Sequence, residues 1–365
     1  MCGPAAPDYV SDTLQITEIP VDGYERVVRG FDPQSGLHAI VAVHDTTLGP
    51  ALGGLRMWNY GSEQEALFDV ERLAKGMSFK SAVARTGLGG GKAVIIGDAK
   101  TIKSEALYLA VGRLVDSLDG LYTTAEDVNT TIEDLEIVRR ATRHVSGLAR
   151  EDGGSGNPSP YTAYGVYLGV RAALGWAFDN DDPKGRKIAI QGVGAVGGPL
   201  AERLAEAGAE VYAYDRNQSR LEKLASEHGV KIVGEQDVMT MECDLFAPCA
   251  LGGVLNDDTI PALKAKAVAG AANNVLLNAE HGKMLDDRGI VYAPDYVINA
   301  GGIINVSVEF HEGGYDEDVA LRKIENIPQA LKELWTIAKD ESISPSDAAD
   351  RLAQRILAEG RAAKA

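Results

Sequence analysis

The chain has 365 residues, a length typical of two domains, and 45% of them are hydrophobic, which is enough for two cores. Its formal net charge of −17 repels nucleic acid and anionic lipid, and no apolar run approaches the length that spans a membrane. These features exclude a nucleic-acid-binding or membrane protein. An anionic substrate is compatible with them where cations gather in a cleft.

Cysteine use and the start of the chain indicate the compartment. The three cysteines, Cys2, Cys243 and Cys249, are an odd number without the spacing of metal ligands. The first stretch, MCGPAAPDYVSDT, has no basic start and no apolar run, so we expect no secretory signal. The sequence therefore predicts a cytoplasmic protein with neither disulfides nor a bound metal.

Strands and helices alternate in the first part of the chain. Residues 25–45 hold two apolar runs around the turn DPQSG, which indicates a hairpin. Ser62 and Glu65 form a capping box that opens a helix over 62–77, and Lys80 follows near the end of this helix.

The next predicted strand, AVIIG, follows directly on a run of glycines and Lys92. The stretch GLGGGKAVIIGD is not a phosphate loop, because Thr86 and Ala93 stand where such a loop needs a glycine and a Ser or Thr. From the residues alone, two interpretations stay open. One is a lysine at a strand mouth where glycines give a ligand close access, and the other is a glycine-rich turn with a solvated lysine.

Two further helices belong to this first α/β domain, which we expect to cover residues 1–150. One helix begins after Ser104, and the other is opened by Thr130 with Glu133. The stretch DGGSGNPSP at 152–160 is rich in Gly and Pro and is the best domain boundary in the chain. It leads into the helix YTAYGVYLGVRAALGWAF.

A βαβ unit after the boundary carries the signature of a dinucleotide site. In KIAIQGVGAVGGPLAERLAEAGAEVYAYD, Gly192, Gly194 and Gly197 have the Rossmann spacing between a strand and a helix. We expect Gly192 to make the tight turn and Gly194 to let a pyrophosphate approach the N–H groups of the helix start. Gly197 would let the helix pack on the strand.

The end of the following strand indicates which dinucleotide is bound. Asp215 comes 18 residues after the third glycine and is expected to accept hydrogen bonds from the adenosine ribose, which favours NAD over NADP. Arg216 beside it weakens this inference, because an arginine there could receive a 2′-phosphate. Two helices close the chain, near 319–338 and 346–359, the second with Ser344 as N-cap.

Several stretches of unusual composition carry a resemblance that covers nearly the whole chain. They are HDTTLGPALGGLRMW (44–58), LAKGMSFK (73–80), LGGGKAVIIGD (88–98), TAEDV (124–128), SGNPSP (155–160), FAPCALGGVLNDDTIP (246–261) and YAPDYVINAGGIINV (292–306). At these residues the sequence resembles the glutamate/leucine/phenylalanine/valine dehydrogenase family, and within it the enzymes that act on leucine.

The resemblance implies residues for the chemistry. Lys80 would bind the substrate α-carboxylate, aided by N–H groups of Gly53 and Gly54. Lys92 would be the general base, Asp127 would position groups and relay protons, and the neighbouring glycines would clear room for substrate and nicotinamide. Partial burial and the nearby cation of Lys80 would lower the pKa of Lys92, whereas the carboxylate of Asp127 would raise it.

The implied reaction is the reversible NAD-dependent oxidative deamination of L-leucine and other branched-chain L-amino acids. A hydride passes from the substrate Cα to the nicotinamide, and water activated by Lys92 attacks the iminium. The resulting carbinolamine gives a 2-oxo acid and ammonium.

The side-chain pocket implied by the resemblance is apolar and consists of Leu52, Ala125, Ile303 and Val306. Such a pocket rejects the second carboxylate of glutamate, because burying it unpaired is costly, and it fits leucine, isoleucine and valine. Relatives that take aromatic substrates tend to carry glycine where this chain has Ala125.

Further contacts with the cofactor are implied around the nicotinamide and the pyrophosphate. Thr162 would bond the carboxamide, and Asn274 would lie near the nicotinamide and the substrate amino group. Ala195 and Val196 belong to the pyrophosphate turn. Cys249, in PCALGG, is interpreted as a small packing residue rather than a nucleophile.

Together these features predict an α/β protein of two domains separated by a cleft. The N-terminal catalytic and oligomerisation domain (1–150) would also receive the C-terminal helix (345–365), and a Rossmann NAD-binding domain would cover 151–344. The resemblance implies a homo-oligomer, an octamer as for the leucine enzymes.

Two alternatives stay open for the function. The stretches AANN (271–274) and EDVN (126–129) are closer to the phenylalanine and valine relatives, so a phenylalanine-type or broad-range amino-acid dehydrogenase is one alternative. The other is a catalytically silent NAD-binding regulator that kept the fold. The joint presence of Lys80, Lys92 and Asp127 argues against a silent regulator.

Overall fold

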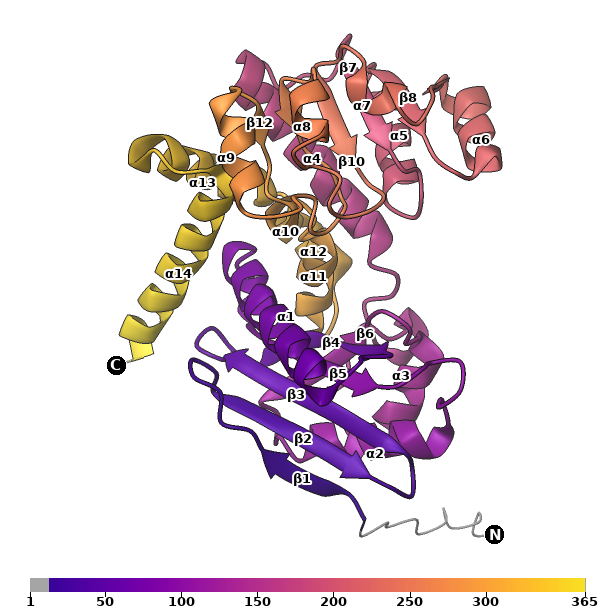
Figure 1. The fold of residues 1–365 in the computed structure, drawn as a ribbon, viewed down its shortest axis with the longest axis vertical. Helices are drawn as coiled ribbons and strands as arrows, with labels where there is room; N and C mark the ends of the chain where they lie inside the picture. The colour runs from indigo at the N-terminus through magenta and orange to yellow at the C-terminus, as the bar shows by residue number, and fades with distance from the viewer. Residues whose placement is uncertain (1–12, 365) are drawn as a thin grey trace. The chain divides into compact units, whose positions relative to one another are not determined.

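The structure is a computed structural model that describes residues 13–364, so Cys2 lies outside the described residues. The chain forms two compact units, each with its own sheet (Figure 1). The first unit runs to Ser78 and resumes over Leu88–Leu148, and the second comprises Phe79–Gly87 and the chain from Ala149 onward. The predicted α/β class and two-part organisation are confirmed. The predicted domain limits and the cleft stay predictions.

The first unit is built on a six-stranded mixed sheet. Its strands pair antiparallel from β1 through β5, and β4 is parallel to both of its neighbours. In pairing order they are β1 (Gln15–Glu18), β2 (Arg26–Asp32), β3 (Leu37–Asp45), β5 (Gly89–Ile96), β4 (Ala51–Trp58) and β6 (Tyr122–Glu126). The predicted hairpin over 25–45 is confirmed as β2 and β3.

Helices cover both faces of this sheet, as the strand alternation requires. Residues of one parity, such as Val41 and Ile95, pack with α2 (Glu105–Asp116) and α3 (Ile132–Arg139). Residues of the other parity, such as Ile40 and Val94, pack with Ala66, Val70 and Ala74 of α1 (Glu63–Val83). The unit therefore has three layers with the sheet in the middle.

The glycine run before Lys92 differs from the prediction, because it lies inside β5 and not in a loop at the mouth of the strand. A Cβ at Gly90 would lie 2.0 Å from the backbone nitrogen of Ser78, and one at Gly89 would lie 2.2 Å from the carbonyl oxygen of Asp45. Here the protein backbone itself occupies the space that the missing side chains leave. The glycines thus let α1 and the end of β3 approach the strand.

Helix starts deviate from the prediction by single residues. Glu65 accepts a hydrogen bond from the backbone of Gly61, whereas the Ser62 hydroxyl accepts the N–H of Glu65 as expected. The cap of α3 is Thr131 with Asp134, not Thr130 with Glu133. Thr130 instead donates to the carbonyl of Leu55 and accepts the N–H of Asp127, and these bonds tie the end of β6 to β4.

The second unit is a parallel, doubly wound sheet. Its strands in pairing order are β12 (Val291–Tyr292), β11 (Ala267–Val268), β10 (Leu245–Pro248), β7 (Lys187–Gln191), β8 (Glu210–Tyr214) and β9 (Lys231–Ile232). The predicted βαβ unit is confirmed as β7, α5 (Gly197–Glu206) and β8. The order reverses at β7, and ligands of such sheets bind where the order reverses, at the carboxyl ends of the strands.

The remaining helices belong to the second unit. They are α4 (Ser159–Phe178), α6 (Gln218–His228), α7 (Asp237–Thr240), α8 (Thr259–Ala262), α9 (Glu280–Asp287), α10 (Asp295–Ile298), α11 (Gly301–Ser307), α12 (Glu317–Ile324), α13 (Ile327–Glu341) and α14 (Pro345–Lys364), with 3₁₀ turns at Arg150–Asp152 and Val308–Phe310. No helix within residues 13–364 is long and apolar enough to cross a membrane.

The helices that end the chain are partly as predicted. The predicted helix over 319–338 is two helices, because Pro328 in the first turn of α13 has no N–H to continue the helix before it. The Ser344 hydroxyl accepts the N–H of Asp347 and caps α14, as expected. Helix α14 packs against α13 and α9. Its packing on the first domain stays a prediction.

Candidate active site

A buried lysine and a partly exposed carboxylate form an ion pair in the first unit. Lys92, in β5, is 5% exposed, and its Nζ lies 2.9 Å from Oδ2 of Asp127, which follows β6. Because β4 lies between β5 and β6, the two side chains meet across it. The structure therefore brings together two of the predicted catalytic residues, Lys92 and Asp127, in one unit.

Burial and pairing act in opposite directions on these two groups. Burial lowers the pKa of the Lys92 ammonium, and the pull of Asp127 in the other direction does not outweigh it. Burial alone would raise the pKa of Asp127, but the Lys92 ammonium and the Arg56 guanidinium together hold it below its usual range. The carboxylate is therefore charged at neutral pH beside a lysine that loses its proton more easily than a free one.

The glycines of β4 leave the space in which this pair forms. A Cβ at Gly54 would lie 2.6 Å from the Cβ of Asp127 and 3.1 Å from Nζ of Lys92. A Cβ at Gly53 would lie 1.8 Å from the carbonyl oxygen of Gly91 in the neighbouring strand. Both glycines are required by this packing. Their predicted contact with a substrate carboxylate stays a prediction.

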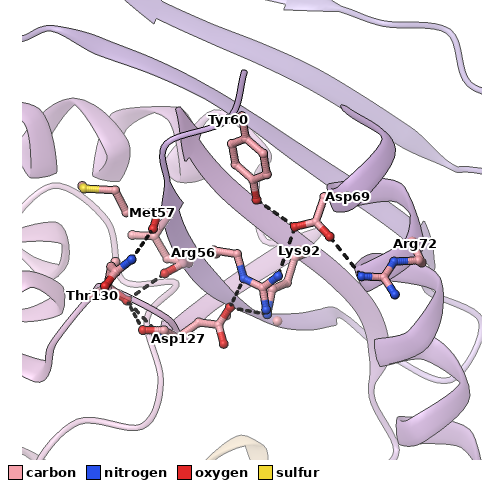
Figure 2. Close-up of polar contacts among 12 residues, drawn as sticks. Arg56, Met57, Tyr60, Asp69, Arg72, Lys92, Asp127 and Thr130 are labelled. Atoms are coloured by element: carbon pink, nitrogen blue, oxygen red, sulfur yellow. Dashed lines mark hydrogen bonds and ion pairs between the residues drawn. The ribbon is translucent and has the colours of Figure 1, made fainter. Parts of the chain in front are cut away.

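A polar network surrounds Asp127 that the sequence analysis missed (Figure 2). Arg56 donates from Nε to Asp127 Oδ2 at 3.1 Å and from Nη1 to Asp69 Oδ2 at 3.0 Å. Tyr60 and Arg72 also donate to Asp69. The signal for Arg56 was its place two residues after the glycine pair of β4, on the same side of the alternating strand as Gly54.

Lys80 lies in the last turn of α1 and belongs to the second unit. Its ammonium donates to Asn299 Oδ1 at 2.6 Å. Asn299 in turn donates to the carbonyl of Ala271 and to Asn273 Oδ1, so it links the lysine to the loop that contains Asn274. The sequence analysis missed Asn299, although it stands in the quoted stretch YAPDYVINAGG.

Asn274 and Thr162 occupy positions with strong local constraints. Asn274 is exposed and has φ of 51°, a left-handed conformation that asparagine tolerates, and its carbonyl accepts the N–H of Gly253. The Thr162 hydroxyl donates to the carbonyl of Pro158, the residue that precedes α4. Their contacts with the nicotinamide stay predictions.

The residues predicted to line the side-chain pocket belong to different units. Leu52 in β4 is buried, and Ala125 in β6 is half-buried. Ile303 and Val306 lie in α11 of the second unit, each with 9% of its surface exposed. All four side chains are apolar, and their common role stays a prediction.

The glycine turn of the second unit has the geometry of a pyrophosphate cradle. Gly192 has φ of 96°, and a Cβ at Gly197 would lie 2.0 Å from the carbonyl oxygen of Gly192. At Gly194, in contrast, the nearest atom to an added Cβ is Nη1 of Arg220 at 3.8 Å. The space above Gly194 is therefore open, where Rossmann folds place the pyrophosphate. Ala195 in the same turn is exposed.

A pocket of about 420 Å³ adjoins this turn. Its lining includes Gly192, Asp215, Arg216 and Glu235. The carboxylate of Asp215 accepts the N–H groups of Val193 and Asn217, each at 2.7 Å, so its orientation is fixed at the edge of the pocket. The residues present therefore fit the adenosine end of a dinucleotide.

The cysteines of the second unit are unpaired thiols. Burial raises the pKa of Cys243 to about 11 and that of Cys249 to about 12. At neutral pH both are protonated and poor nucleophiles, in line with the packing role expected of Cys249. Among the residues that the structure describes, no cluster of His, Cys, Asp or Glu could hold a metal.

Two family models match the chain: the Glu/Leu/Phe/Val dehydrogenase dimerisation domain over residues 25–144 and glutamate/leucine/phenylalanine/valine dehydrogenase over residues 211–364. The leucine dehydrogenase of Geobacillus stearothermophilus is 50% identical over 341 residues, which are 93% of this chain and 92% of that protein. The chain belongs to the glutamate/leucine/phenylalanine/valine dehydrogenase family. It is an amino-acid dehydrogenase, as the sequence predicted.

Other members of the glutamate/leucine/phenylalanine/valine dehydrogenase family are almost as similar. The valine dehydrogenase of Streptomyces coelicolor is 47% identical over 342 residues, or 93% of each chain. The crystal structure of L-tryptophan dehydrogenase from Nostoc punctiforme has a TM-score of 0.84 and 40% identity, and the match covers 93% of this chain and 97% of that one.

Proposed function

We propose that this family member catalyses the reversible, NAD-dependent oxidative deamination of L-leucine and other branched-chain L-amino acids to 2-oxo acids and ammonium. The observation that carries the proposal is the buried ammonium of Lys92 held by Asp127, beside Gly54, whose missing side chain leaves room for the pair. A lysine with a lowered pKa suits the hydration of an iminium, because it can take a proton from water near working pH. The leucine dehydrogenases at about 50% identity support the substrate class.

The proposed residues act in sequence on the substrate. Lys80 binds the α-carboxylate with help from the N–H groups of Gly53 and Gly54. When bound, NAD supplies the acceptor for the hydride of the substrate Cα. Lys92 then takes a proton from water as the oxygen adds to the iminium carbon.

Asp127 stabilises the ammonium that Lys92 becomes in this step, because the two groups are already paired in the structure. Lys92 returns the proton to the nitrogen of the carbinolamine. As the C–N bond breaks, Lys92 takes the proton of the carbinolamine hydroxyl, and ammonia and the 2-oxo acid are released. Apolar contacts from Leu52, Ala125, Ile303 and Val306 select aliphatic side chains.

We assign NAD to the glycine turn and the pocket beside it. Gly192, Gly194, Ala195, Val196 and Gly197 would hold the pyrophosphate, with Thr162 and Asn274 near the nicotinamide. Asp215 would bond the ribose hydroxyls and repel a 2′-phosphate, and its position at the edge of the pocket supports this role. Arg216 lines the same pocket, so the strength of the preference for NAD over NADP is part of the test.

We also propose a cytoplasmic homo-oligomer, an octamer by resemblance. The match to a dimerisation domain over residues 25–144 supports self-association, and a solved relative at 22% identity is described as a hetero-hexamer. The low cysteine count and the free thiols suit a reducing compartment.

The test is the formation of NADH by the purified full chain at alkaline pH. L-leucine, L-valine, L-isoleucine, L-phenylalanine and L-glutamate are compared with NAD and with NADP. We expect turnover of the three branched-chain substrates with NAD and its loss in Lys92→Ala. The matched control is Lys283→Ala, which removes an exposed lysine of α9 whose ammonium pairs with Asp287 one turn later.

The other outcomes decide between the alternatives. A clear preference for phenylalanine would contradict the pocket argument from Ala125 and favour a phenylalanine-type enzyme. Binding of NAD without turnover of any amino acid would overturn the enzymatic proposal and favour a silent regulator.

A further inference from the structure

Two cations compete for one oxygen of Asp127. Lys92 Nζ lies 2.9 Å from Oδ2, and Arg56 Nε lies 3.1 Å from the same atom. The side chains of Arg56 and Asp127 are 22% and 23% exposed, so water screens the interaction only in part. The charge of the carboxylate is therefore shared between the lysine and the guanidinium.

Arg56 is itself held in place from its far side. Its Nη1 donates to Asp69 Oδ2 at 3.0 Å, and the Tyr60 hydroxyl donates to the same oxygen at 2.8 Å. Arg72 donates to the other oxygen of Asp69 at 3.3 Å. Because a guanidinium is a rigid fork, fixing Nη1 on Asp69 also fixes the direction of Nε toward Asp127 (Figure 2).

We propose that Arg56 is a positioning residue: anchored by Asp69, it fixes the Asp127 carboxylate and limits how much of its charge reaches Lys92. The inference deepens the proposed function and rests on it, because it concerns how the proposed base loses its proton. Arg56 and Lys92 both contact Oδ2 of Asp127, and the charge of Arg56 also acts on Lys92 directly.

The charged groups around Lys92 and Asp127 determine how the loss of Arg56 should change the pKa of Lys92. The charges of Arg56 and Asp69 act on Lys92 besides Asp127, and the charge of Asp127 also acts on Tyr122 and Glu126. Burial is the largest cause of the lowered pKa of Lys92, and the Arg56 cation lowers it further. Loss of the guanidinium would leave Asp127 to Lys92 alone, so the pKa of both groups would rise.

The first readout is the titration of the Lys92 amine itself. Acetic anhydride would be added to the full chain at a series of pH values, and the acetylation of the Lys92 peptide would be followed by mass spectrometry. We expect the pKa of Lys92 to rise by about one unit in Arg56→Met. Arg56→Lys keeps the charge and should leave this pKa near that of the wild type.

The matched control is Arg72→Met. It removes a guanidinium that also bonds Asp69 and has no recorded contact with Asp127, so the titration of Lys92 should not move. Thermal unfolding checks that each variant folds. If Arg56→Met does not fold, Arg56→Gln takes its place, since it also removes the guanidinium charge and should raise the pKa of Lys92 in the same way.

The second readout is the pH dependence of kcat/KM with the best amino acid. In Arg56→Met the rising limb of kcat/KM, which reports deprotonation of the base, should shift by about one unit to higher pH. At pH values below the pKa of the base, kcat/KM should therefore be about tenfold lower than in the wild type. In Arg56→Lys the limb should stay and kcat should fall, because the fixed orientation is lost. A folded Arg56→Met chain with an unchanged Lys92 titration would overturn the inference. A chain without turnover would contradict the proposed function only, because the acetylation readout needs no activity.

Discussion

The protonation of Lys92 depends on a competition between burial and one carboxylate. Burial removes water from the ammonium and lowers its pKa, while Asp127 stabilises the charged form and limits that decrease. Both effects are expected from the sequence, and their balance is set by burial, which depends on residues that lie far apart in the chain. The structure resolves the sign in favour of burial.

Replacing Asp127 with asparagine should move the pH profile of the enzyme downward. Without the carboxylate, the pKa of Lys92 falls further below its usual value of about 10.5, so the limb of kcat/KM that rises with pH should shift to lower pH. The maximal rate should fall at the same time, because the base has lost its orienting partner. The measurement is kcat/KM against pH for the wild type and Asp127→Asn.

Glu126→Gln is the control for this prediction. It removes the neighbouring carboxylate and leaves the pair of Lys92 and Asp127 in place, so the limb should not move. A limb that moves to higher pH in Asp127→Asn would contradict the balance of effects described above.

At the scale of elements, the contact between α1 and β5 depends on an absent side chain. The backbone of Ser78 lies where a Cβ at Gly90 would be, at 2.0 Å from the nitrogen and 2.4 Å from Cα. Backbone atoms of a helix cannot move aside singly, as a flexible side chain could. The close approach of helix and strand is therefore intolerant of even one methyl group.

We expect Gly90→Ala to lower the free energy of unfolding by about 3 kcal/mol, as overpacking of this kind does at the upper end of its range. Gly76→Ala in the same helix should raise it by up to about 1 kcal/mol, because nothing lies within 4 Å of the added Cβ and alanine favours a helix. Urea denaturation of both variants measures the two effects. Equal midpoints for Gly90→Ala and wild type would show that the helix can move away.

The turn after β7 offers a second pair of contrasting glycines. Gly194→Ala has room for its methyl group within the protein, so the variant should fold with an unchanged melting temperature. The methyl group would face the pyrophosphate and should weaken NAD binding about tenfold, the effect of losing about one charge-assisted hydrogen bond. Calorimetric titration with NAD measures the affinity.

Gly197→Ala should have the opposite effect and lower the stability of the fold. Its Cβ would lie 2.0 Å from the carbonyl of Gly192, so the variant should lose stability before it loses affinity. Unchanged NAD affinity in a folded Gly194→Ala variant would contradict the proposal that this turn binds the pyrophosphate.

The sequence predicted the elements well where local signals decide them and poorly where packing does. The hairpin, the βαβ unit and the Ser344 cap follow from turn residues, spacing and a capping side chain. Three glycines in a row are unfavourable for a strand, so only the neighbours of β5 explain why Gly89, Gly90 and Gly91 belong to it.

The candidate site shows the same division. Lys92 and Asp127 were identified from motifs, whereas the anchor formed by Asp69 and Tyr60 was not. Arg56 and Asp127 are 71 residues apart in the sequence, and Arg56 and Asp69 are 13 apart, with no periodicity that joins them. Such a network depends on the pairing of β4 with β6 and on the place of α1, which single-chain patterns do not reveal.

For the whole molecule, the net charge of −17 opposes the association of copies. Apolar surface favours it: Phe68 on α1 is 68% exposed and Trp58 at the end of β4 is 52% exposed. Salt weakens the repulsion far more than it weakens apolar contacts, because the screening length falls from about 10 Å at 0.1 M to about 3 Å at 1 M.

Self-association of the full chain should therefore increase with ionic strength. At limiting protein concentration, sedimentation velocity should show a larger share of the oligomer at about 1 M than at about 0.1 M sodium chloride. Dissociation by salt would instead indicate an interface held by ion pairs. A monomer at every salt concentration would contradict the proposed homo-oligomer.

The protonated thiols of Cys243 and Cys249 make the protein suitable for site-specific labelling. With pKa values of about 11 and about 12, these groups react slowly with maleimides at neutral pH. After Cys2→Ser, one cysteine introduced on the surface of each unit could carry a fluorophore. Energy transfer between the two dyes would then follow the distance between the units as substrate and NAD are added.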